Sequence, residues 1–177
     1  MNKVWKKIRS KKVFECYKFK VFEDDVIMPD GNQGKYFLIE RLSSVAIIPF
    51  DGKKIYLVNQ YRYTIKKRSW QLPAGRAENK NYLFQAKKEL REETGIKASK
   101  WHYLGQFFPS VGSSSHIGKI YLAEKLEFGK PELEPSESDM HMKGFTLEQI
   151  DQMVKNGSID DGWVMVCLYY FRLFKKL

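Results

Sequence analysis

Apolar and polar residues alternate along the start of the chain, with the clearest run between Val13 and Phe22. The sequence Pro29-Asp30-Gly31 follows and is typical of a tight turn. Alternation with a period of two predicts strands that expose one face, and the turn makes them antiparallel. We therefore expect residues 1–41 to form an N-terminal antiparallel β subdomain and residues 42–177 to form a second, larger domain.

A basic run, Lys6 to Lys12, lies within this N-terminal stretch. It could bind a polyanion, or it could be the solvated edge of a sheet that charge protects from pairing with other chains. We favour the charged edge and assign no function to the run.

Two apolar segments, Val45–Phe50 and Ile55–Val58, are separated by Asp51-Gly52, which is a strong hairpin signal. We expect a buried hairpin here. Its second strand continues to Tyr63 and places the guanidinium of Arg62 at the strand end. That group could contact a phosphate or carboxylate in bidentate fashion, or it could pair with a nearby acid on the surface.

A helix is predicted from about Tyr82 to Thr94, where Gly95 can end it in the left-handed conformation. Leu83, Ala86 and Leu90 form a stripe at helical spacing that we expect to pack on the sheet. The stripe leaves a charged face beside it.

Three acids, Glu89, Glu92 and Glu93, project together from this helix. Like charges at such spacing destabilise a helix by about 0.2–0.5 kcal/mol per pair, so a cation is expected among them. Mg²⁺ is suited to the position, because it takes oxygen ligands and often shares a few carboxylates with waters and substrate phosphates. The alternative is a solvated helix face on which neighbouring Lys and Arg residues balance the charge.

The remaining chain predicts strands, loops and two further helices. A capping box at Thr146 begins a short amphipathic helix, and Asp160 or Asp161 can begin the last one. His116 is expected to be a polar surface residue of a loop rather than a metal ligand, since no second His or Cys is spaced to join it. The other expected elements are strands at Trp101–Phe108 and Ile120–Ala123, the polar loop Pro109–His116 and the acidic loop Pro131–Asp139.

With 177 residues, of which 43% are hydrophobic, the chain can bury one core. Its net charge of +10 favours an anionic partner but does not distinguish nucleic acid, an anionic membrane and a phosphorylated small molecule. No nucleic-acid motif is evident, which makes nucleic acid the weaker expectation. Two distant cysteines, the absence of a signal peptide and the absence of a long apolar run lead us to expect a soluble, cytoplasmic protein that does not bind membranes.

The glutamate helix resembles the signature of the Nudix hydrolases. Their box reads Gly, five residues, Glu, seven residues, then Arg-Glu-U-x-Glu-Glu-x-Gly-U, where U is aliphatic, and Lys88–Ile96 matches its second half with Lys in place of Arg. In the first half, Gly75 lies one position too close to Lys88, and Lys80 or Asn81 stands where the box has its first Glu. A deletion of one residue in this loop explains both departures.

Flanking segments are similar to the ADP-ribose pyrophosphatase branch, whose members hydrolyse nucleoside diphosphate sugars. The similar segments span nearly the whole chain: Pro29-Asp30-Gly31, Asn59 to Tyr63, Trp70 to Gly75, Pro109 to Gly112 and Ile159-Asp160-Asp161. The resemblance implies an α/β fold, namely an α/β/α sandwich around a mixed sheet, preceded by the N-terminal antiparallel β subdomain and often assembled as a homodimer.

The resemblance also implies roles for individual residues. Glu89 and Glu93 would be the main Mg²⁺ ligands, with Glu92 close by and the Ala74 carbonyl as a further ligand; Mn²⁺ could replace Mg²⁺. Arg62 would bind substrate phosphates. Glu92 and Glu93 would act in catalysis with an acid from the late loop, for which Glu137 is the best match and Asp139 the second.

The implied reaction is metal-dependent hydrolysis of the pyrophosphate bond of a nucleoside diphosphate sugar, with ADP-ribose first, to a nucleoside monophosphate and a sugar phosphate. The altered first half of the box leaves one alternative open. In that alternative the chain is a catalytically weak or inactive Nudix-fold protein that senses or binds a nucleotide.

Overall fold

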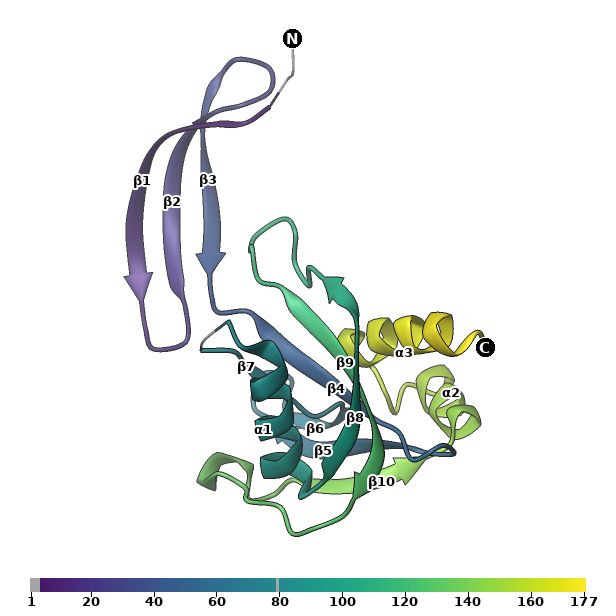
Figure 1. The fold of residues 1–177 in the computed structure, drawn as a ribbon. Coiled ribbons are helices and arrows are strands. Elements are labelled where there is room, and N and C mark those ends of the chain that lie inside the picture. The colour runs from purple at the N-terminus through teal and green to yellow at the C-terminus, as the bar shows by residue number, and fades with distance from the viewer. Residues whose placement is uncertain (1–3, 79) are drawn as a thin grey trace. The chain divides into compact units, whose positions relative to one another are not determined.

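The computed structural model describes residues 4–78 and 80–177 (Figure 1). The chain divides into two compact units. One comprises Met1–Ser43 with Phe108–Ile117, and the other comprises Ser44–Phe107 with Gly118–Leu177. The first unit is therefore assembled from two separate stretches of sequence. The predicted division of the chain into residues 1–41 and 42–177 stays a prediction.

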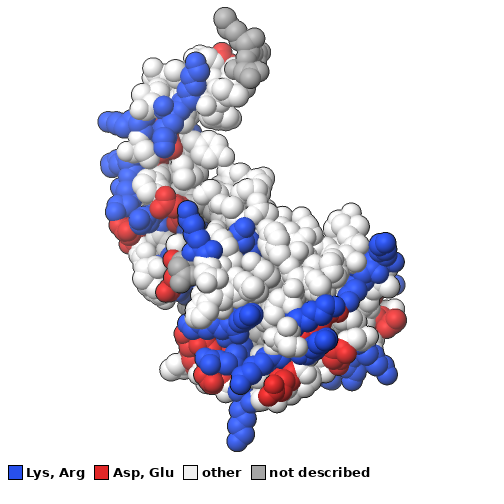
Figure 2. Space-filling model, in the orientation of Figure 1, with Lys and Arg blue, Asp and Glu red and all other residues white. Residues whose placement is uncertain are grey.

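The first unit contains a three-stranded antiparallel sheet in the order β1-β2-β3. Its strands are β1 (Lys6–Glu15), β2 (Lys20–Ile27) and β3 (Gln33–Glu40). Strand β1 is an edge strand exposed along its whole length, and its Arg9 pairs with Asp25 of β2 at 2.9 Å. Figure 2 shows basic side chains gathered on this unit with acidic ones among them. The basic run is thus a charged sheet edge, as predicted.

The second unit contains a four-stranded sheet in the order β7-β4-β9-β8, in which β4 and β9 are parallel and the other pairs are antiparallel. A smaller antiparallel sheet has the order β10-β5-β6. The strands are β4 (Ser44–Pro49), β5 (Ile55–Arg62), β6 (Lys67–Gln71), β7 (Ala74–Arg76), β8 (Lys97–Phe107), β9 (Gly118–Glu127) and β10 (His141–Phe145).

Helices cover both faces of the mixed sheet. They are α1 (Tyr82–Thr94), α2 (Leu147–Lys155) and α3 (Gly162–Lys175), and a short 3-10 helix, η1, spans Pro135–Glu137. In β4, Val45 and Ile47 pack with α1, whereas Ala46 and Ile48 pack with α2 and α3. This two-residue alternation separates two apolar cores. The predicted α/β/α sandwich around a mixed sheet, with an antiparallel sheet at the N-terminus, is confirmed.

The predicted hairpin between residues 45 and 58 is wrong in its pairing. The chain does turn at Asp51, whose N–H donates to the carbonyl of Lys54 at 3.2 Å. However, β4 and β5 belong to different sheets, and the only backbone pairing described between these two segments is the bridge between Phe50 and Ile55. Because β7 and β9 already occupy both edges of β4, that strand has no free edge for β5.

Two burial predictions are also wrong. Leu83 is 37% exposed, and Gln85 is buried in α1 instead. His116 is 4% exposed rather than at the surface. Burial, together with the positive charge of Arg41 in the same unit, lowers the pKa of His116 to about 4, so this imidazole is neutral at pH 7.

Both cysteines are free, Cys16 at intermediate exposure and Cys167 in the core. Burial raises the pKa of the Cys167 thiol, so it is an unreactive apolar residue at neutral pH. Among the helices in the described residues, none has the length and apolar character needed to cross a membrane.

Candidate functional site

Both ends of α1 are fixed by caps, which sets the direction in which its glutamates project. The Asn81 side chain accepts a hydrogen bond from the N–H of Phe84 at 3.2 Å. At the other end Gly95 adopts a φ of 71° and donates its N–H to the carbonyl of Arg91 at 2.8 Å. Asn81, one of the two residues that stand in place of the first Glu of the Nudix box, thus stabilises the helix instead.

Glu93 is the most buried acid of this helix, with 6% of its surface exposed. Its Oε2 accepts a hydrogen bond from the N–H of Ala74 in β7 at 3.0 Å. Burial and then repulsion from Glu89 raise the pKa of Glu93 well above its usual range, and the opposing attraction of Arg62 is weaker. A negative charge here is therefore costly unless a cation accompanies it.

Glu89 lies against the backbone of β7. Its Oε1 accepts a hydrogen bond from Gln85 Nε2 at 2.7 Å. A Cβ on Gly75 would lie 1.9 Å from the same oxygen, so a side chain at this position would displace the carboxylate. Burial is the main cause that raises the pKa of Glu89, and repulsion from Glu92 adds to it.

Glu92 differs from its two neighbours because it has cationic partners on its own helix. Its carboxylate lies 3.7 Å from Lys88 Nζ and 3.9 Å from an Arg91 nitrogen. The Lys that replaces the Arg of the box thus makes one long contact, where a guanidinium could have made a bidentate one. Part of the helix face therefore is balanced by neighbouring cations, but the buried part is not.

Glu137 reaches the same cluster from η1. Its charge repels Glu89 and Glu93, and its own pKa is raised mainly by burial, with repulsion from Glu134 and Glu92 adding to it and Arg62 opposing it. The structure thus brings together five residues that the sequence singled out: Arg62, Glu89, Glu92, Glu93 and Glu137.

Asp139 is engaged elsewhere. Its Oδ2 accepts hydrogen bonds from the N–H of Tyr61 and from Arg68, both at 3.0 Å. The hydrogen bond from Tyr61 is the main cause that lowers the pKa of Asp139. On the other side of Glu137, Gln60 Nε2 donates to the carbonyl of Ser136 at 3.0 Å. Together these contacts fasten the loop that carries Glu137 to β5 and β6.

Arg62 is exposed at the end of β5 and is oriented by a chain of hydrogen bonds. Its Nε donates to Gln71 Oε1 at 2.6 Å, and Gln71 Nε2 donates to Asp161 Oδ2 at 2.6 Å. Asp161 in turn caps α3 through the N–H of Trp163 at 2.8 Å. No ion pair with a carboxylate holds Arg62 within the described part of the chain, so its terminal nitrogens can bind an anion.

Three glutamines that position these groups were missed in the sequence: Gln60, Gln71 and Gln85. Gln85 could have been found, because it precedes Glu89 by one helical turn and side chains at that spacing meet. Gln60 bonds to Ser136, and Gln71 joins Arg62 to the distant Asp161, and no local pattern indicates these long-range contacts.

The donor set suits a hard divalent cation. Glu89 and Glu93 offer carboxylate oxygens whose mutual repulsion a cation would relieve. Among residues 4–78 and 80–177, no group of three or more His, Cys, Asp or Glu side chains could hold a metal ion by itself. Two carboxylates completed by waters, a carbonyl and phosphate oxygens are the kind of coordination that Mg²⁺ commonly takes. The residues therefore fit a cation that shares its ligands with a phosphorylated compound.

Known proteins support this interpretation. The chain is 35% identical over 145 residues to a protein named ADP-ribose pyrophosphatase from Mycobacterium tuberculosis, a match that covers 80% of this chain and 70% of the relative. An ADP-ribose pyrophosphatase from Bacillus subtilis is 27% identical over 97% of this chain and 95% of its own. A methanol dehydrogenase activator from Bacillus methanolicus is 28% identical with the same coverage.

The fold has a close structural counterpart. A crystal structure described as an ADP compounds hydrolase superposes with a TM-score of 0.85 over 97% of this chain and 94% of its own, at 16% identity. The model of the NUDIX domain matches residues 40–164, which include β4, the whole glutamate helix and the loop of Glu137. The chain therefore belongs to the NUDIX domain family and is a Nudix hydrolase related to the ADP-ribose pyrophosphatases.

Proposed function

We propose that this protein hydrolyses the pyrophosphate bond of a nucleoside diphosphate sugar, with ADP-ribose as the foremost substrate, to a nucleoside monophosphate and a sugar phosphate. The observation that carries the proposal is a pair of acids, the partly buried Glu89 and the buried Glu93, beside the guanidinium of Arg62, for which the described part of the chain offers no ion-paired carboxylate. Two relatives that bear the name ADP-ribose pyrophosphatase support the choice of substrate.

Glu89 and Glu93 would hold Mg²⁺, or Mn²⁺ in its place, with the Ala74 carbonyl as a further ligand and Glu92 through water or directly. When bound, the cation supplies charge neutralisation at the phosphoryl oxygens and lowers the pKa of an attacking water. The N–H of Ala74 fixes Glu93, and Gln85 fixes Glu89, so the two ligand carboxylates are oriented before substrate arrives.

Glu137 would accept the proton of the attacking water. Its pKa is raised by burial and by neighbouring acids, which makes it a stronger base than an exposed carboxylate. Asp139, the other candidate, accepts two hydrogen bonds and has a lowered pKa. We assign Asp139 the role of a positioning residue that holds the loop of Glu137.

Arg62 would bind the diphosphate of the substrate. The Nε bond to Gln71 leaves both terminal nitrogens of the guanidinium for bidentate contact with phosphate oxygens. Since Gln71 is itself held by the cap of α3, the guanidinium would meet the substrate with little loss of side-chain entropy.

A homodimer is part of the proposal. The N-terminal unit exposes large apolar side chains, among them Trp5 at 51%, Phe14 at 51% and Phe37 at 58%. Such exposure favours association with a second copy. Light scattering coupled to size-exclusion chromatography is expected to give twice the monomer mass of 20.9 kDa; a monomeric mass would contradict the proposed homodimer.

The free cysteines suit a reducing, cytoplasmic compartment.

A substrate panel tests the proposed reaction. The purified chain is incubated with ADP-ribose, other nucleoside diphosphate sugars and dinucleotides, each with Mg²⁺, with Mn²⁺ and with EDTA, and the products are separated by chromatography. We expect AMP and ribose 5-phosphate from ADP-ribose in the presence of metal only. Tight binding of ADP-ribose without turnover of any compound would instead identify a nucleotide sensor.

A further inference from the structure

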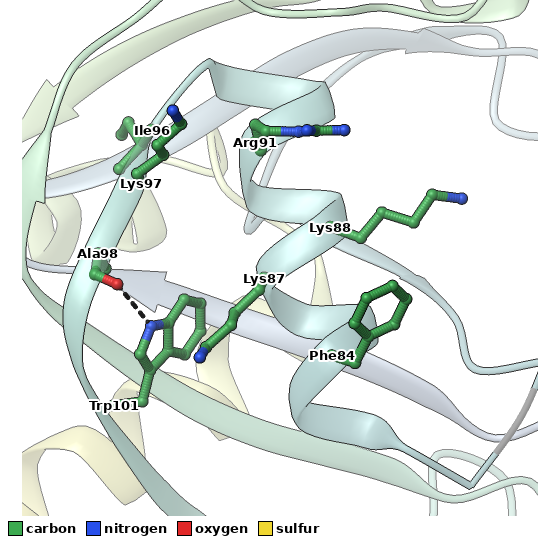
Figure 3. A pocket seen from close by; sticks show the side chains of 8 residues that line it. All are labelled: Phe84, Lys87, Lys88, Arg91, Ile96, Lys97, Ala98 and Trp101. Carbon is green, nitrogen blue, oxygen red and sulfur yellow. Dashed lines mark hydrogen bonds between the residues drawn. The ribbon is translucent and has the colours of Figure 1, made fainter.

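A cavity of about 390 Å³ lies between α1 and the start of β8 (Figure 3). Helix α1 contributes Phe84, Lys87, Lys88 and Arg91, and the strand contributes Lys97 and Trp101. Positions 84, 87, 88 and 91 share one side of a helix, because they are three, four and seven residues apart. Glu89 and Glu93 project from the other side, so this cavity is distinct from the candidate active site.

Four basic side chains surround the cavity, and their charges are only partly balanced. Lys88 pairs with Glu92 at 3.7 Å, and Arg91 pairs with Glu132 at 3.4 Å. Within the described chain no carboxylate pairs with Lys87 or Lys97, and both are exposed. Two lysines beside two partly neutralised cations attract an anion to this cavity electrostatically.

Aromatic side chains give the cavity a second property. Phe84 is 56% exposed on the helix, so much of its ring is accessible from the cavity that it lines. Trp101 lies on the strand, where its Nε1 donates to the carbonyl of Ala98 at 2.9 Å (Figure 3). This bond satisfies the polar atom of the indole. The ring packs against the core on one part of its surface and lines the cavity with another.

We propose that this cavity is a second, non-catalytic binding site for a compound that combines a planar ring with a phosphate group, of which a nucleoside monophosphate is the simplest. The ring would stack on Trp101 or Phe84, and the phosphate would contact Lys87 and Lys97. The volume is within the range of about 300–1,000 Å³ that small-molecule sites occupy. The inference does not depend on the proposed hydrolysis, because it uses none of the residues assigned to that reaction.

The indole N–H of Trp101 provides a local probe. Its resonance in the ¹⁵N-labelled full-length protein is identified by its absence in Trp101→Phe, and AMP is titrated in the presence of EDTA. We expect saturable movement of this resonance. Adenosine, which lacks the phosphate, and ribose 5-phosphate, which lacks the ring, should each bind about tenfold more weakly, a difference that corresponds to about 1.4 kcal/mol. A Trp101 resonance that AMP does not move would overturn the proposal.

Charge-reversal variants distinguish binding in this cavity from nonspecific attraction to a basic protein. The double variant Lys87→Glu/Lys97→Glu should weaken AMP binding at Trp101 by about tenfold or more, since two attractive contacts become repulsive. The matched control Lys53→Glu/Lys155→Glu changes the net charge equally at exposed lysines elsewhere in the same unit and should bind like the wild type. Equal weakening in both variants would contradict a built site.

Two further experiments test whether the signal comes from the active site and whether the ligand is a nucleic acid. In Glu93→Gln, AMP should move the Trp101 resonance as in the wild type, because the active site is on the opposite face of α1; loss of the movement would assign the effect to the active site instead. A short single-stranded RNA should bind no more tightly than AMP. Binding that is more than tenfold tighter would replace the small-molecule site by a nucleic-acid surface.

Discussion

Two groups of partly buried carboxylates in the second unit show opposite electrostatics. Glu124 on β9 is 14% exposed and lies 3.1 Å from Lys100, 3.1 Å from His102 and 2.5 Å from Lys175. Burial alone would raise its pKa, but hydrogen bonds from Lys175 and Lys100 outweigh burial and lower it to about 2. The pKa values of Glu89 and Glu93 are raised, because burial and mutual repulsion are not compensated.

The opposite pKa shifts distinguish an acid that is paired within the fold from acids whose charge the protein leaves unbalanced. Glu124 joins β8, β9 and α3 through its three basic partners, so its charge is neutralised within the protein. The chain contains 31 Lys and Arg residues, yet within its described part none forms a close ion pair with Glu89 or Glu93. Acids that stay uncompensated in a strongly basic protein indicate a site that an external cation completes.

The largest expected effect is on catalysis. Glu93→Gln should lower kcat for ADP-ribose by at least about a thousandfold, because it removes the negative charge of a proposed metal ligand. The amide oxygen can still accept the N–H of Ala74, so the fold should persist. Steady-state kinetics with circular dichroism as the control measure both. A variant as active as the wild type would show that the site assignment is wrong.

The second largest effect is expected on kcat when the two acids of the late loop, Glu137 and Asp139, are changed in turn. Glu137→Gln should lower kcat by about 10²–10⁴-fold and abolish the acidic limb of the pH profile, since it removes the proposed base. Asp139→Asn should lower kcat by only about tenfold, because it weakens the attachment of the loop and leaves the base in place.

The pH profile distinguishes the two roles. Asp139→Asn should keep the shape of the wild-type curve, while Glu137→Gln should flatten it below neutral pH. If Asp139→Asn loses the acidic limb and Glu137→Gln retains it, the assignments are reversed.

A smaller effect is expected on stability at Glu124. Glu124→Gln should lower the free energy of unfolding by about 1 kcal/mol at pH 7, since it leaves Lys100 and Lys175 without their charged partner. The pKa of Glu124 is lowered from 4.5 to about 2, so its stabilisation is present above pH 4.5 and is lost as the pH falls toward 2. Urea unfolding of both proteins at pH 7 and pH 3 should show the difference shrinking; a constant difference would contradict this account.

The smallest effect is expected on stability at Glu93, where the dependence on pH is opposite to that at Glu124. Its pKa is raised in the folded protein, so without metal the protein loses stability as the pH rises from 4.5 through the raised value. In EDTA at pH 7, Glu93→Gln should therefore have a higher Tm than the wild type, by about 2–4 °C for each kcal/mol of repulsion relieved. Added Mg²⁺ should raise the Tm of the wild type more than that of the variant in differential scanning calorimetry, and an equal rise would count against the metal site.

Local features of the site could be predicted from the sequence because they depend on near neighbours. The spacing of the glutamates, the stop at Gly95 and the capping box at Thr146 each act within one or two helical turns, and each is present in the structure. The position of Arg62 at a strand end also follows from a local apolar pattern that ends there.

Long-range features could not be predicted in this way. Whether Ile55 continues the sheet of β4 depends on which strand edges remain free, and β7 and β9 fill them from elsewhere in the chain. The burial of His116 and the hydrogen bond of Gln60 to the loop of Glu137 depend on packing between distant segments. The spacing of apolar residues along a strand or a helix is a local property and contains no information about these contacts.

The assembly of the first unit from two stretches of sequence has a consequence for synthesis on the ribosome. In β3, Ile39 donates its N–H to the carbonyl of Ser113 at 2.7 Å and forms a bridge with Ser114, and Tyr36 donates its hydroxyl to the carbonyl of Gly112 at 2.6 Å. At about 5–20 residues per second, these partners emerge about 4–15 seconds after β3. Until then the nascent sheet lacks its last segment, and its exposed apolar side chains are available to chaperones during that interval.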